Sequence, residues 1–535
     1  MPNYERFNRQ KLIDFLLLPS SYPHRTSWVR HVQTHASDVF IAPPYVYKVK
    51  KPVDFGFLDF STLEKRRHFC NIEVELNRRL CKGVYLGVEE ITIKDGKLSL
   101  GGTGTTVEYA VKMRKLPERK FLVNLLRRGM ITEEELRRLV RKLVDFYRRQ
   151  LPKEEVLIYG HPEKIKINVD ENLALSEKFT DKTISREAYD SIKYYNEIFF
   201  RDETGIFMRR MEDNFIKDCH GDLHLDHINI GTDDICIYDC IEFNERFRYI
   251  DTASDIAFLA MDLDYNGYPG FARFIVKEIS VAMDDKGIYD VMDFYKCYRA
   301  FVRGKVESIR AYEPEVPDEE KQASRERAQK YFRFALRYAL FGSAPTVIIV
   351  FGIIGAGKST LATLLGKELL CRIVSSDPVR KEITGTLSGE RRYDEWGGGI
   401  YTEDITEATY GEIITRALDR LDEDGAVILD ASFSKRKWRE VFSSRAKEKN
   451  ADVRFIRTTA PIDIIEERLL SREKEGKSVS DARVSILDRF ISEWEEPEEI
   501  KDRFYFETDT NRPEREVLKS VFMWILASRA KHENV

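Results

Sequence analysis

The sequence predicts an α+β unit followed by an α/β unit with a parallel sheet. Up to about residue 112, short β-rich runs surround one helical run, and the segment 115–340 is mostly helical in its apolar spacing. After Pro345, strands and helices alternate, which is typical of a parallel sheet covered by helices. The 535 residues are too many for a single core. We therefore expect domains at 1–342 and 343–535, the first with two lobes that meet near residue 112.

The charged residues nearly cancel, with 87 Lys and Arg against 91 Asp and Glu and a net charge of -4. This balance disfavours a general polyanion-binding protein, so we expect no nucleic-acid partner. The seven cysteines are scattered without a CxxC pair, and we expect reduced thiols and no structural zinc. No signal-like or membrane-spanning run is present, which predicts a cytoplasmic protein without a membrane partner. The oligomeric state is left open.

The first lobe is predicted to be a sheet with one helix. Two β-rich runs at 37–44 and 45–51 are separated by a Pro-Pro turn. Apolar side chains at helical spacing predict a helix over 61–80. An Asp-Gly pair within 89–100 is typical of a hairpin turn, and 105–116 predicts a strand that leads out of the lobe.

The second lobe is predicted to be mostly helical. Thr132 and Glu135 have the spacing of a capping box at the start of a helix. A short β island interrupts the helices at 220–243. A charged helix over 317–342 then leads to Pro345, the expected domain boundary.

The α/β unit is predicted to contain five strands with helices between them. The predicted strands span 347–353, 372–377, 426–432, 452–460 and 504–510. The predicted helices span 358–370, 402–424, 461–475 and 480–496.

A phosphate-binding loop is predicted between the first of these strands and the helix that follows it. The segment Gly352 to Ser359 fills every fixed position of G-x-x-x-x-G-K-[ST]. Its glycines let backbone N–H groups face phosphate, Lys358 reaches the β- and γ-phosphates, and Ser359 ligates Mg²⁺. The alternative, a glycine-rich turn that only joins strand to helix, does not account for the lysine and the hydroxyl. The predicted ATP-binding residues are Gly352, Gly355, Gly357, Lys358, Ser359 and Thr360.

Five further residues favour a kinase over a generic ATPase. Asp377 is placed to orient or deprotonate an acceptor hydroxyl, and Arg380 to hold an anionic substrate. The alternative is an Asp N-cap beside a surface arginine. Asp430 ends a strand where it can hold Mg²⁺ through water. Arg468 and Arg472, at i and i+4, can clamp the transferred phosphate or form a solvated helix face.

The sequences GIIGAGKST, SSDPVRKE, VILDASF and ERLLSRE make 346–510 resemble the small P-loop kinases related to gluconate kinase, polynucleotide 5′-kinase and zeta toxin. The resemblance implies an adenylate-kinase-like core that passes the γ-phosphate of ATP to a hydroxyl. It does not identify the acceptor, because such families share the machinery and differ in the substrate pocket.

A second chemically dense stretch is CHGDLHLDHINI, which presents Asp222 in a loop. The strand that follows offers Asp239 and Glu242. Such a pair of segments fits one carboxylate that orients an acceptor and another that holds Mg²⁺. The alternative is a hydrogen-bonded turn in which His224 and His227 are packing residues.

This stretch resembles the catalytic loop of the aminoglycoside phosphotransferase and choline kinase family, H-G-D-x-x-x-x-N followed by a strand that ends in Asp. The resemblance, over about 30–270, implies a two-lobed, protein-kinase-like fold with Asp222 as the catalytic Asp and Asp239 as a metal ligand. Lys48 then contacts the α- and β-phosphates and pairs with Glu73. Lys50 and Glu75 are the alternative choices for that pair.

The same resemblance implies that 107–113 is the hinge that reads adenine through its backbone, with Tyr109 and Val111 as the binding residues. It also implies that Asp255 is a structural Asp.

One position departs from the family pattern. Five residues after Asp222, where the family has a metal-binding Asn, the chain has His227, and Asn229 lies two residues further on. Imidazole is a poor Mg²⁺ ligand. Either Asn229 is the rerouted metal ligand, or metal binding is altered, or this part binds nucleotide without efficient transfer.

The order of the two halves resembles bacterial tandem proteins described as bifunctional aminoglycoside phosphotransferase-like and ATP-binding proteins, through YKVKKPVDFGFLDFSTLEKRRHFC and YDCIEFNERFRYID. The sequence therefore predicts a tandem phosphotransferase that uses ATP and Mg²⁺ at two sites and phosphorylates a small-molecule hydroxyl. One alternative is a nucleic-acid 5′-hydroxyl kinase. The other is an ATP-binding regulator whose kinase-like half is a pseudoenzyme, which His227 favours.

Overall fold

The computed structural model describes residues 8–386, 399–475 and 484–529. By its internal contacts the chain forms two compact units. The first unit comprises Met1–Asn168 and Thr204–Tyr295, and the second comprises Val169–Glu203 and Lys296–Val535. This division differs from the predicted boundary near residue 342, because helices from the middle of the chain pack with the α/β part. Whether 1–342 and 343–535 are separate domains stays a prediction.

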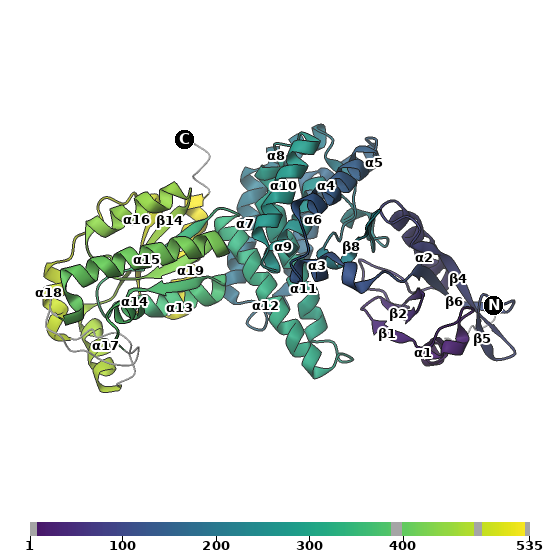
Figure 1. Ribbon diagram of the computed structural model, residues 1–535, viewed down its shortest axis with the longest axis horizontal. Helices are drawn as coiled ribbons and strands as arrows, with labels where there is room; N and C mark the ends of the chain where they lie inside the picture. Colours follow the sequence, from purple (N-terminus) through teal and green to yellow (C-terminus); the bar gives the residue numbers. More distant parts are fainter. Residues whose placement is uncertain (1–7, 387–398, 476–483, 530–535) are drawn as a thin grey trace. The chain divides into compact units, whose positions relative to one another are not determined.

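The first unit contains a six-stranded antiparallel sheet in the order β1-β2-β3-β6-β4-β5 (Figure 1). The predicted hairpin is present, and Asp95 and Gly96 at its turn have φ of 50° and 75°. The strands are β1 (Arg30–Gln33), β2 (Ser37–Ala42), β3 (Tyr45–Lys50), β4 (Tyr85–Lys94), β5 (Lys97–Leu100) and β6 (Thr105–Arg114).

The two faces of this sheet are covered by different helices. Tyr47 and Val49 of β3 pack in one apolar cluster with α1 (Arg9–Leu17). Val46, on the opposite face, packs in a second cluster with α2 (Leu63–Arg78). Since side chains alternate along a strand, Lys48 and Lys50 face α2 as well.

The remainder of the first unit is mostly helical, as predicted, and α4, α9 and α10 pack together. Thr132 and Glu135 form the predicted capping box at the start of α4. Its helices are α3 (Leu122–Arg127), α4 (Glu133–Arg148), α5 (Glu154–Leu157), α8 (Thr204–Glu212), α9 (Thr252–Tyr265) and α10 (Pro269–Met283). Two further helices, α6 (Pro162–Ser176) and α11 (Ile288–Ala311), run from the first unit into the second. Its short strand pairs are β7 (Ile216–Asp218) with β10 (Tyr249–Asp251), and β8 (Ile228–Ile230) with β9 (Ile235–Ile237).

The second unit is built on the predicted parallel sheet, in the order β12-β13-β11-β14-β15. The strands are β11 (Thr346–Phe351), β12 (Arg372–Ser375), β13 (Ala426–Asp430), β14 (Asp452–Thr459) and β15 (Tyr505–Asp509). The helices are α7 (Arg186–Asp202), α12 (Asp318–Phe341), α13 (Lys358–Leu369), α14 (Ser376–Ile383), α15 (Glu403–Asp424), α16 (Arg436–Glu448), α17 (Ile462–Glu475), α18 (Leu487–Ser492) and α19 (Glu514–Arg529).

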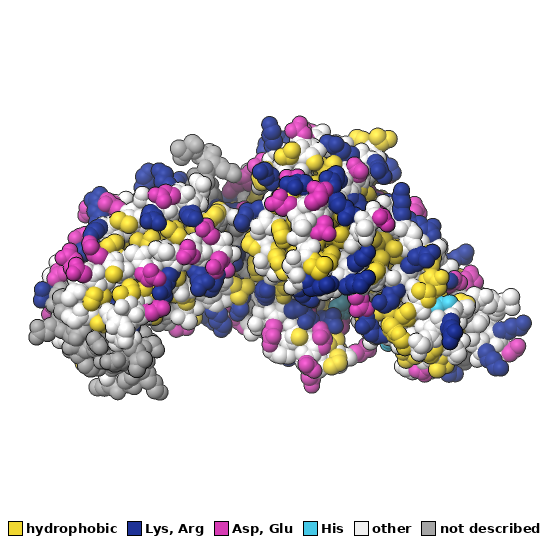
Figure 2. All heavy atoms as spheres, in the orientation of Figure 1, with side chains coloured by type: hydrophobic (Ala, Val, Ile, Leu, Met, Phe, Trp, Pro, Cys, Tyr) yellow, Lys and Arg dark blue, Asp and Glu magenta, His cyan; other side chains and the backbone are white. Residues whose placement is uncertain are grey.

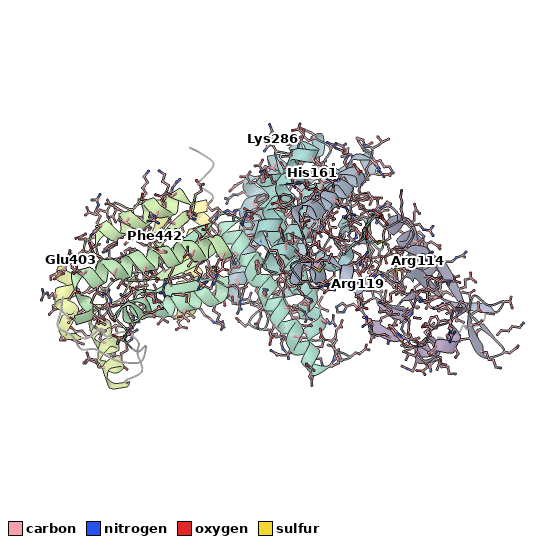
Figure 3. The ribbon with its side chains drawn as sticks, viewed as in Figure 1. Arg114, Arg119, His161, Lys286, Glu403 and Phe442 are labelled. Carbon is pink, nitrogen blue, oxygen red and sulfur yellow. A yellow bond between two sulfur atoms is a disulfide. The ribbon has the colours of Figure 1, made fainter. Side chains whose placement is uncertain are left out.

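These helices contact one another in two groups, α14, α15 and α16 in one and α7, α12, α13 and α19 in the other. Phe442, labelled in Figure 3, is buried between α16 and the sheet with Phe433 and Phe455. Burial on both faces explains why β11 reads as a continuous apolar run. Among the described residues, no helix is both long enough and apolar enough to cross a bilayer.

One expectation about the cysteines is wrong. The sulfur atoms of Cys81, just after α2, and Cys236, in β9, form a disulfide with Cα atoms 4.4 Å apart. The pair is separated by 155 residues in sequence, so only the tertiary fold brings the two thiols together. The other cysteines are free and buried.

Candidate functional site

The phosphate loop lies at the carboxyl edge of the parallel sheet, between the central strand β11 and helix α13. Gly352, Gly355 and Gly357 all have positive φ, of 145°, 77° and 83°. A Cβ on Gly352 would lie 2.5 Å from the carbonyl oxygen of Thr458, and one on Gly357 would lie 2.8 Å from Oγ1 of Thr510. The loop path therefore requires glycine at both positions.

Lys358 is the first residue of α13, and its Nζ donates a hydrogen bond to the carbonyl oxygen of Ile353, 2.9 Å away. Burial lowers the pKa of Lys358, while Asp430 and Asp377 raise it and Arg472 lowers it. These charges are therefore close enough to influence one another, although they come from four different segments. The structure thus brings together four of the predicted site residues.

Asp430 is the last residue of β13, which pairs with β11, the strand that leads into the phosphate loop. The hydroxyl of Ser375 donates to its Oδ2 at 3.2 Å. Burial raises the pKa of Asp430, although the charge of Lys358 and a hydrogen bond from Ser359 act to lower it. Ser359 and Asp430 together offer the oxygen ligands that Mg²⁺ prefers. The predicted ATP-binding residue Thr360 follows, exposed in the first turn of α13.

We expect Asp430→Asn to raise the free energy of unfolding of the nucleotide-free protein at pH 7 by about 0.5–2 kcal/mol. A folded-state pKa above the unfolded value means that the charged carboxylate opposes folding once the pH exceeds the unfolded pKa, and the amide removes that cost. Urea unfolding at pH 7 and pH 4 measures the effect, which should shrink at the lower pH. A gain of equal size at both pH values would contradict this explanation.

Asp377 is the second residue of α14 and is half-buried near the same sheet edge. Arg380 follows one turn later on the same helix. It is 8% exposed, and its Nη1 donates to the carbonyl oxygen of Ile400 and to Oγ1 of Thr406, both at 3.1 Å. Arg380 therefore joins α14 to the start of α15, and its contact with an anionic substrate stays a prediction.

The two arginines of the predicted clamp have different surroundings, and the clamp itself stays a prediction. Arg468 donates from Nη1 to Oγ1 of Thr510 at 2.8 Å and from Nη2 to the carbonyl oxygen of Thr510 at 2.9 Å. Thr510 in turn donates to the carbonyl oxygen of Ala356 in the phosphate loop, at 3.1 Å. Arg468 thus holds the segment after β15 against the loop, while Arg472 is left near Lys358. Sequence reasoning missed Thr510, and its position just after the last strand was the available signal.

The first unit brings a second set of predicted residues together. Nζ of Lys48 lies 2.9 Å from Oε1 of Glu73 and 2.6 Å from Oδ1 of Asp239. Burial alone would lower the pKa of Lys48, but Asp239 and Glu73 hold it well above its ordinary value. The predicted pairing of Lys48 with Glu73 is therefore present, whereas Glu75 points to solvent.

A second lysine shares this cluster. Nζ of Lys50 lies 2.6 Å from Oε2 of Glu73 and also pairs with Glu242, so Glu73 forms ion pairs with both lysines. Lys50 and Glu73 are fully buried. The sequence offered Lys50 only as an alternative to Lys48, and it offered Glu242 as a candidate carboxylate for Mg²⁺ or an acceptor and not as a partner of Lys50. The alternation of Lys48 and Lys50 along one strand was the signal that both face one partner.

Asp222 lies in a loop fastened by Asp255. The two carboxylate oxygens of Asp255 accept hydrogen bonds from the backbone N–H groups of His220 and Gly221, at 3.0 and 2.9 Å. The hydroxyl of Tyr147 donates to the same carboxylate at 2.8 Å. This is the structural role that the sequence implied for Asp255.

His227 lies between the two predicted aspartates. Its Nδ1 is 3.5 Å from Oδ2 of Asp222, and its Nε2 is 3.5 Å from Oδ2 of Asp239. Burial, together with the neighbouring His224, lowers the pKa of His227 to about 4, so the ring is neutral at pH 7. Asn229, the predicted metal ligand, instead donates from Nδ2 to the carbonyl oxygen of Pro117 at 3.0 Å. The side chain at this position of the site is therefore imidazole and not amide.

The predicted hinge is wrong. Val111 pairs with Lys48 of β3 and Val88 of β4, so its backbone lies inside the sheet. The N–H of Tyr109 donates to Oε1 of Glu108 at 3.0 Å, and both predicted side chains are buried against α2. The strand leaves the sheet only after Arg114, and Figure 3 labels Arg114 and Arg119 on either side of the connecting segment.

Comparison with known proteins adds to this geometry. Residues 347–497 match the family model described as "AAA domain". Uncharacterized proteins of Mycobacterium tuberculosis and Mycobacterium bovis are 28% identical over 498 residues, which is 92% of this chain and 94% of theirs.

Three solved structures illustrate the resemblance of the C-terminal region. A Sinorhizobium meliloti gluconokinase is 19% identical with a TM-score of 0.26, and the match covers 35% of this chain and 94% of the other. An Aquifex aeolicus shikimate kinase is 16% identical with a TM-score of 0.24, over 35% and 99%. A Mycobacterium tuberculosis APS kinase is 15% identical with a TM-score of 0.25, over 34% and 98%. Scores this low carry no argument about activity. The parallel sheet, the phosphate loop and the family match together make the C-terminal region a P-loop domain.

Proposed function

We propose that the chain is an ATP-dependent phosphotransferase whose P-loop domain passes the γ-phosphate of ATP to a hydroxyl of a small molecule. The observation that carries this proposal is that Lys358 begins the helix after the phosphate loop, while Asp430 ends the strand paired with β11 and Asp377 directly follows β12 at the same edge of the sheet. A generic ATPase needs the loop and a metal-binding carboxylate. Asp377, presented on a different segment, adds a group that can accept the proton of an acceptor hydroxyl.

ATP and Mg²⁺ fit the residues that are present. The glycines with positive φ open the loop backbone to phosphate at the start of α13, where the helix dipole favours negative charge. Ser359 and Asp430 would hold Mg²⁺, which when bound neutralises charge on the β- and γ-phosphates. A small acceptor is proposed over nucleic acid because Lys and Arg are interspersed with Asp and Glu on the face drawn in Figure 2.

We also propose that the first unit holds a second nucleotide site, built like that of the aminoglycoside phosphotransferase and choline kinase family. Its support is the ion pair of Lys48 with Glu73, the Asp222 loop fastened by Asp255, and Asp239 beside Lys48. In this proposal Lys48 contacts phosphate, and Asp222 accepts the proton of the acceptor hydroxyl. The backbone that reads adenine would be the segment after Arg114.

The test is a screen with radiolabelled ATP against sugars, nucleosides, cyclitols and 5′-hydroxyl oligonucleotides, using wild type, Lys358→Ala and Asp222→Asn. The proposal expects two activities, of which each variant loses one. Loss of both activities in either variant would indicate one composite site. Label found only on the oligonucleotides would favour the nucleic-acid kinase.

We expect Asp222→Asn to lower the activity of the first unit by about 100- to 10,000-fold without weakening ATP binding. The amide keeps the shape of the side chain but cannot accept the hydroxyl proton. The measurement is the rate of label transfer in the Lys358→Ala background, with ATP affinity from equilibrium dialysis. Asp233→Asn, at an exposed position in the turn between β8 and β9, is the matched control. If Asp222→Asn in the Lys358→Ala background were as active as Lys358→Ala alone, the result would favour the alternative of an ATP-binding regulator.

A further inference from the structure

Two histidines and an aspartate converge in the loop that follows β7. Oδ2 of Asp222 lies 3.5 Å from Nε2 of His224 and 3.5 Å from Nδ1 of His227. One ligand atom from each of the three residues can be chosen so that all lie within 4.8 Å of one another. Such convergence of a carboxylate and two imidazoles is what a metal ion requires of its ligands.

The loop holds these side chains in place through its backbone. Leu225–His227 form one 3-10 turn, and the N–H of His227 donates to the carbonyl oxygen of His224 at 3.0 Å. The N–H of Leu225 donates to the buried carboxylate of Asp262 at 2.9 Å. As a result the two imidazole rings lie together, with centroids 3.8 Å apart. The spacing D-x-H-x-x-H thus becomes one cluster.

Each imidazole also has a carboxylate near its other nitrogen. Nε2 of His227 is 3.5 Å from Oδ2 of Asp239, and Nδ1 of His224 is 4.0 Å from Oδ2 of Asp226. Histidines that bind metals almost always donate their second N–H to a carboxylate, a carbonyl or water, which fixes the ring and raises its basicity. At 3.5 and 4.0 Å these two contacts are longer than hydrogen bonds, so the carboxylates flank the rings at ion-pair distance without fixing them.

We propose that Asp222, His224 and His227 form a binding site for a divalent transition-metal ion of the Zn²⁺ class, with one position open to water or a hydroxyl. Bonds of about 2.1 Å in a tetrahedral site separate neighbouring ligand atoms by about 3.4 Å. The 3.5 Å distances from Asp222 to both imidazoles match that edge. Imidazole ligands select zinc-class ions, whereas Mg²⁺ selects oxygen ligands.

One contact of the metal-free loop must change when the ion binds. Nδ1 of His227 lies 3.0 Å from the backbone carbonyl oxygen of Asp222, to which the protonated nitrogen donates a hydrogen bond. In the proposed site His227 gives up this hydrogen bond and the ion binds Nδ1. An ion about 2.1 Å from Nδ1 does not fit on the 3.0 Å line to that carbonyl oxygen, so the ring or the loop backbone must shift when the ion binds.

The inference rests on the proposed function only in that Asp222 belongs to both sites. An ion on Asp222 occupies the oxygen that would accept a hydroxyl proton, so the metal-bound form lacks the catalytic base and the two roles of Asp222 exclude each other. The site would therefore depart from the Mg²⁺ chemistry that the family resemblance implies.

The test is a Co²⁺ titration of the full chain, prepared without a histidine tag, stripped of metal and free of nucleotide. Visible absorption distinguishes four-coordinate from six-coordinate Co²⁺, and Zn²⁺ is then added to displace it. We expect wild type to bind Co²⁺ in the strongly absorbing four-coordinate form and to release it to Zn²⁺. His224→Ala and His227→Ala should each weaken binding by more than about 100-fold. His68→Ala, on an exposed face of α2, should bind as wild type does.

Two further measurements keep the outcome decisive. Thermal unfolding without metal shows whether each variant is folded, and His224→Gln replaces His224→Ala if the latter is not. Zn²⁺ should raise the Tm of wild type and of His68→Ala but not that of His227→Ala. Co²⁺ bound equally by wild type and by folded His227→Ala would overturn the proposal, as would wild type that binds none.

The failure of this inference can be told apart from failure of the proposed nucleotide site. Binding of Mg²⁺ with ATP is measured separately in the Lys358→Ala background. ATP binding without the Co²⁺ spectrum rejects the metal site alone. The Co²⁺ spectrum without ATP binding rejects the nucleotide site alone.

Discussion

Replacing Glu73 by alanine is expected to lower the free energy of unfolding of the first unit by about 3–5 kcal/mol. Glu73 is fully buried, with its two carboxylate oxygens 2.9 Å from Nζ of Lys48 and 2.6 Å from Nζ of Lys50. Removing it leaves two buried ammonium groups with less compensation, and an unpaired buried charge costs more than the lost pair itself. Urea unfolding followed by circular dichroism measures the change.

Glu75→Ala is the matched control, because Glu75 lies two residues later on the same helix but faces solvent. It should leave the unfolding midpoint unchanged. Although burial raises the pKa of Glu73, Lys48 and Lys50 lower it overall. A lowered folded-state pKa gives stability that is present above the unfolded pKa and lost as the pH falls through the folded value. The difference in the free energy of unfolding between wild type and Glu73→Gln should therefore become smaller as the pH is lowered. A difference that stays the same at all pH values would contradict this explanation.

Lys358→Ala is expected to lower phosphate transfer by the P-loop domain by about 100- to 1000-fold. The ammonium group lies at the start of α13 inside the loop, where charge develops on the transferred phosphate. Label transfer from radiolabelled ATP measures the loss. The first unit should keep its own nucleotide binding in this variant.

Lys367→Ala tests whether the loss of phosphate transfer comes from the position of Lys358 in the phosphate loop or only from removing one positive charge from α13. Lys367 lies in the last turn of α13 and is exposed. We expect it to transfer phosphate at the wild-type rate, with an unchanged Tm. If Lys358→Ala retained full activity with every acceptor, the proposed role of the phosphate loop would be wrong.

The α/β unit shows how much of the fold could be predicted. Each strand from β11 to β15 was predicted as a short apolar run between helical segments, and the phosphate loop was predicted from Gly352, Gly357 and Lys358. These features depend on short segments of the chain, because two strands joined by a crossover helix in one sheet run parallel to each other. Parallel strands end at one edge, so Asp430 and Asp377 were placed near the loop without knowledge of the strand order.

The arginines show where such reasoning fails. The spacing of residues along a helix placed Arg380 and Arg468 near the site. It could not predict which groups their guanidinium groups bind. Nη1 of Arg380 donates to Ile400 and Thr406, and Arg468 donates to Thr510, partners that lie 20 to 42 residues away in sequence. The hinge prediction failed for a similar reason, because only strand pairing places β6 between β3 and β4.

The sequence by itself determined the five strands of the parallel sheet, the phosphate loop and the residue types that its chemistry needs, because spacing, capping and glycine requirements act over a few residues. Tertiary structure alone decided which charges meet. It joined Lys50 to Glu242 across 192 residues, placed His227 between Asp222 and Asp239, and turned Asn229 away from them. Buried charges must find partners of opposite sign, and those partners lie wherever the packing of distant segments brings them.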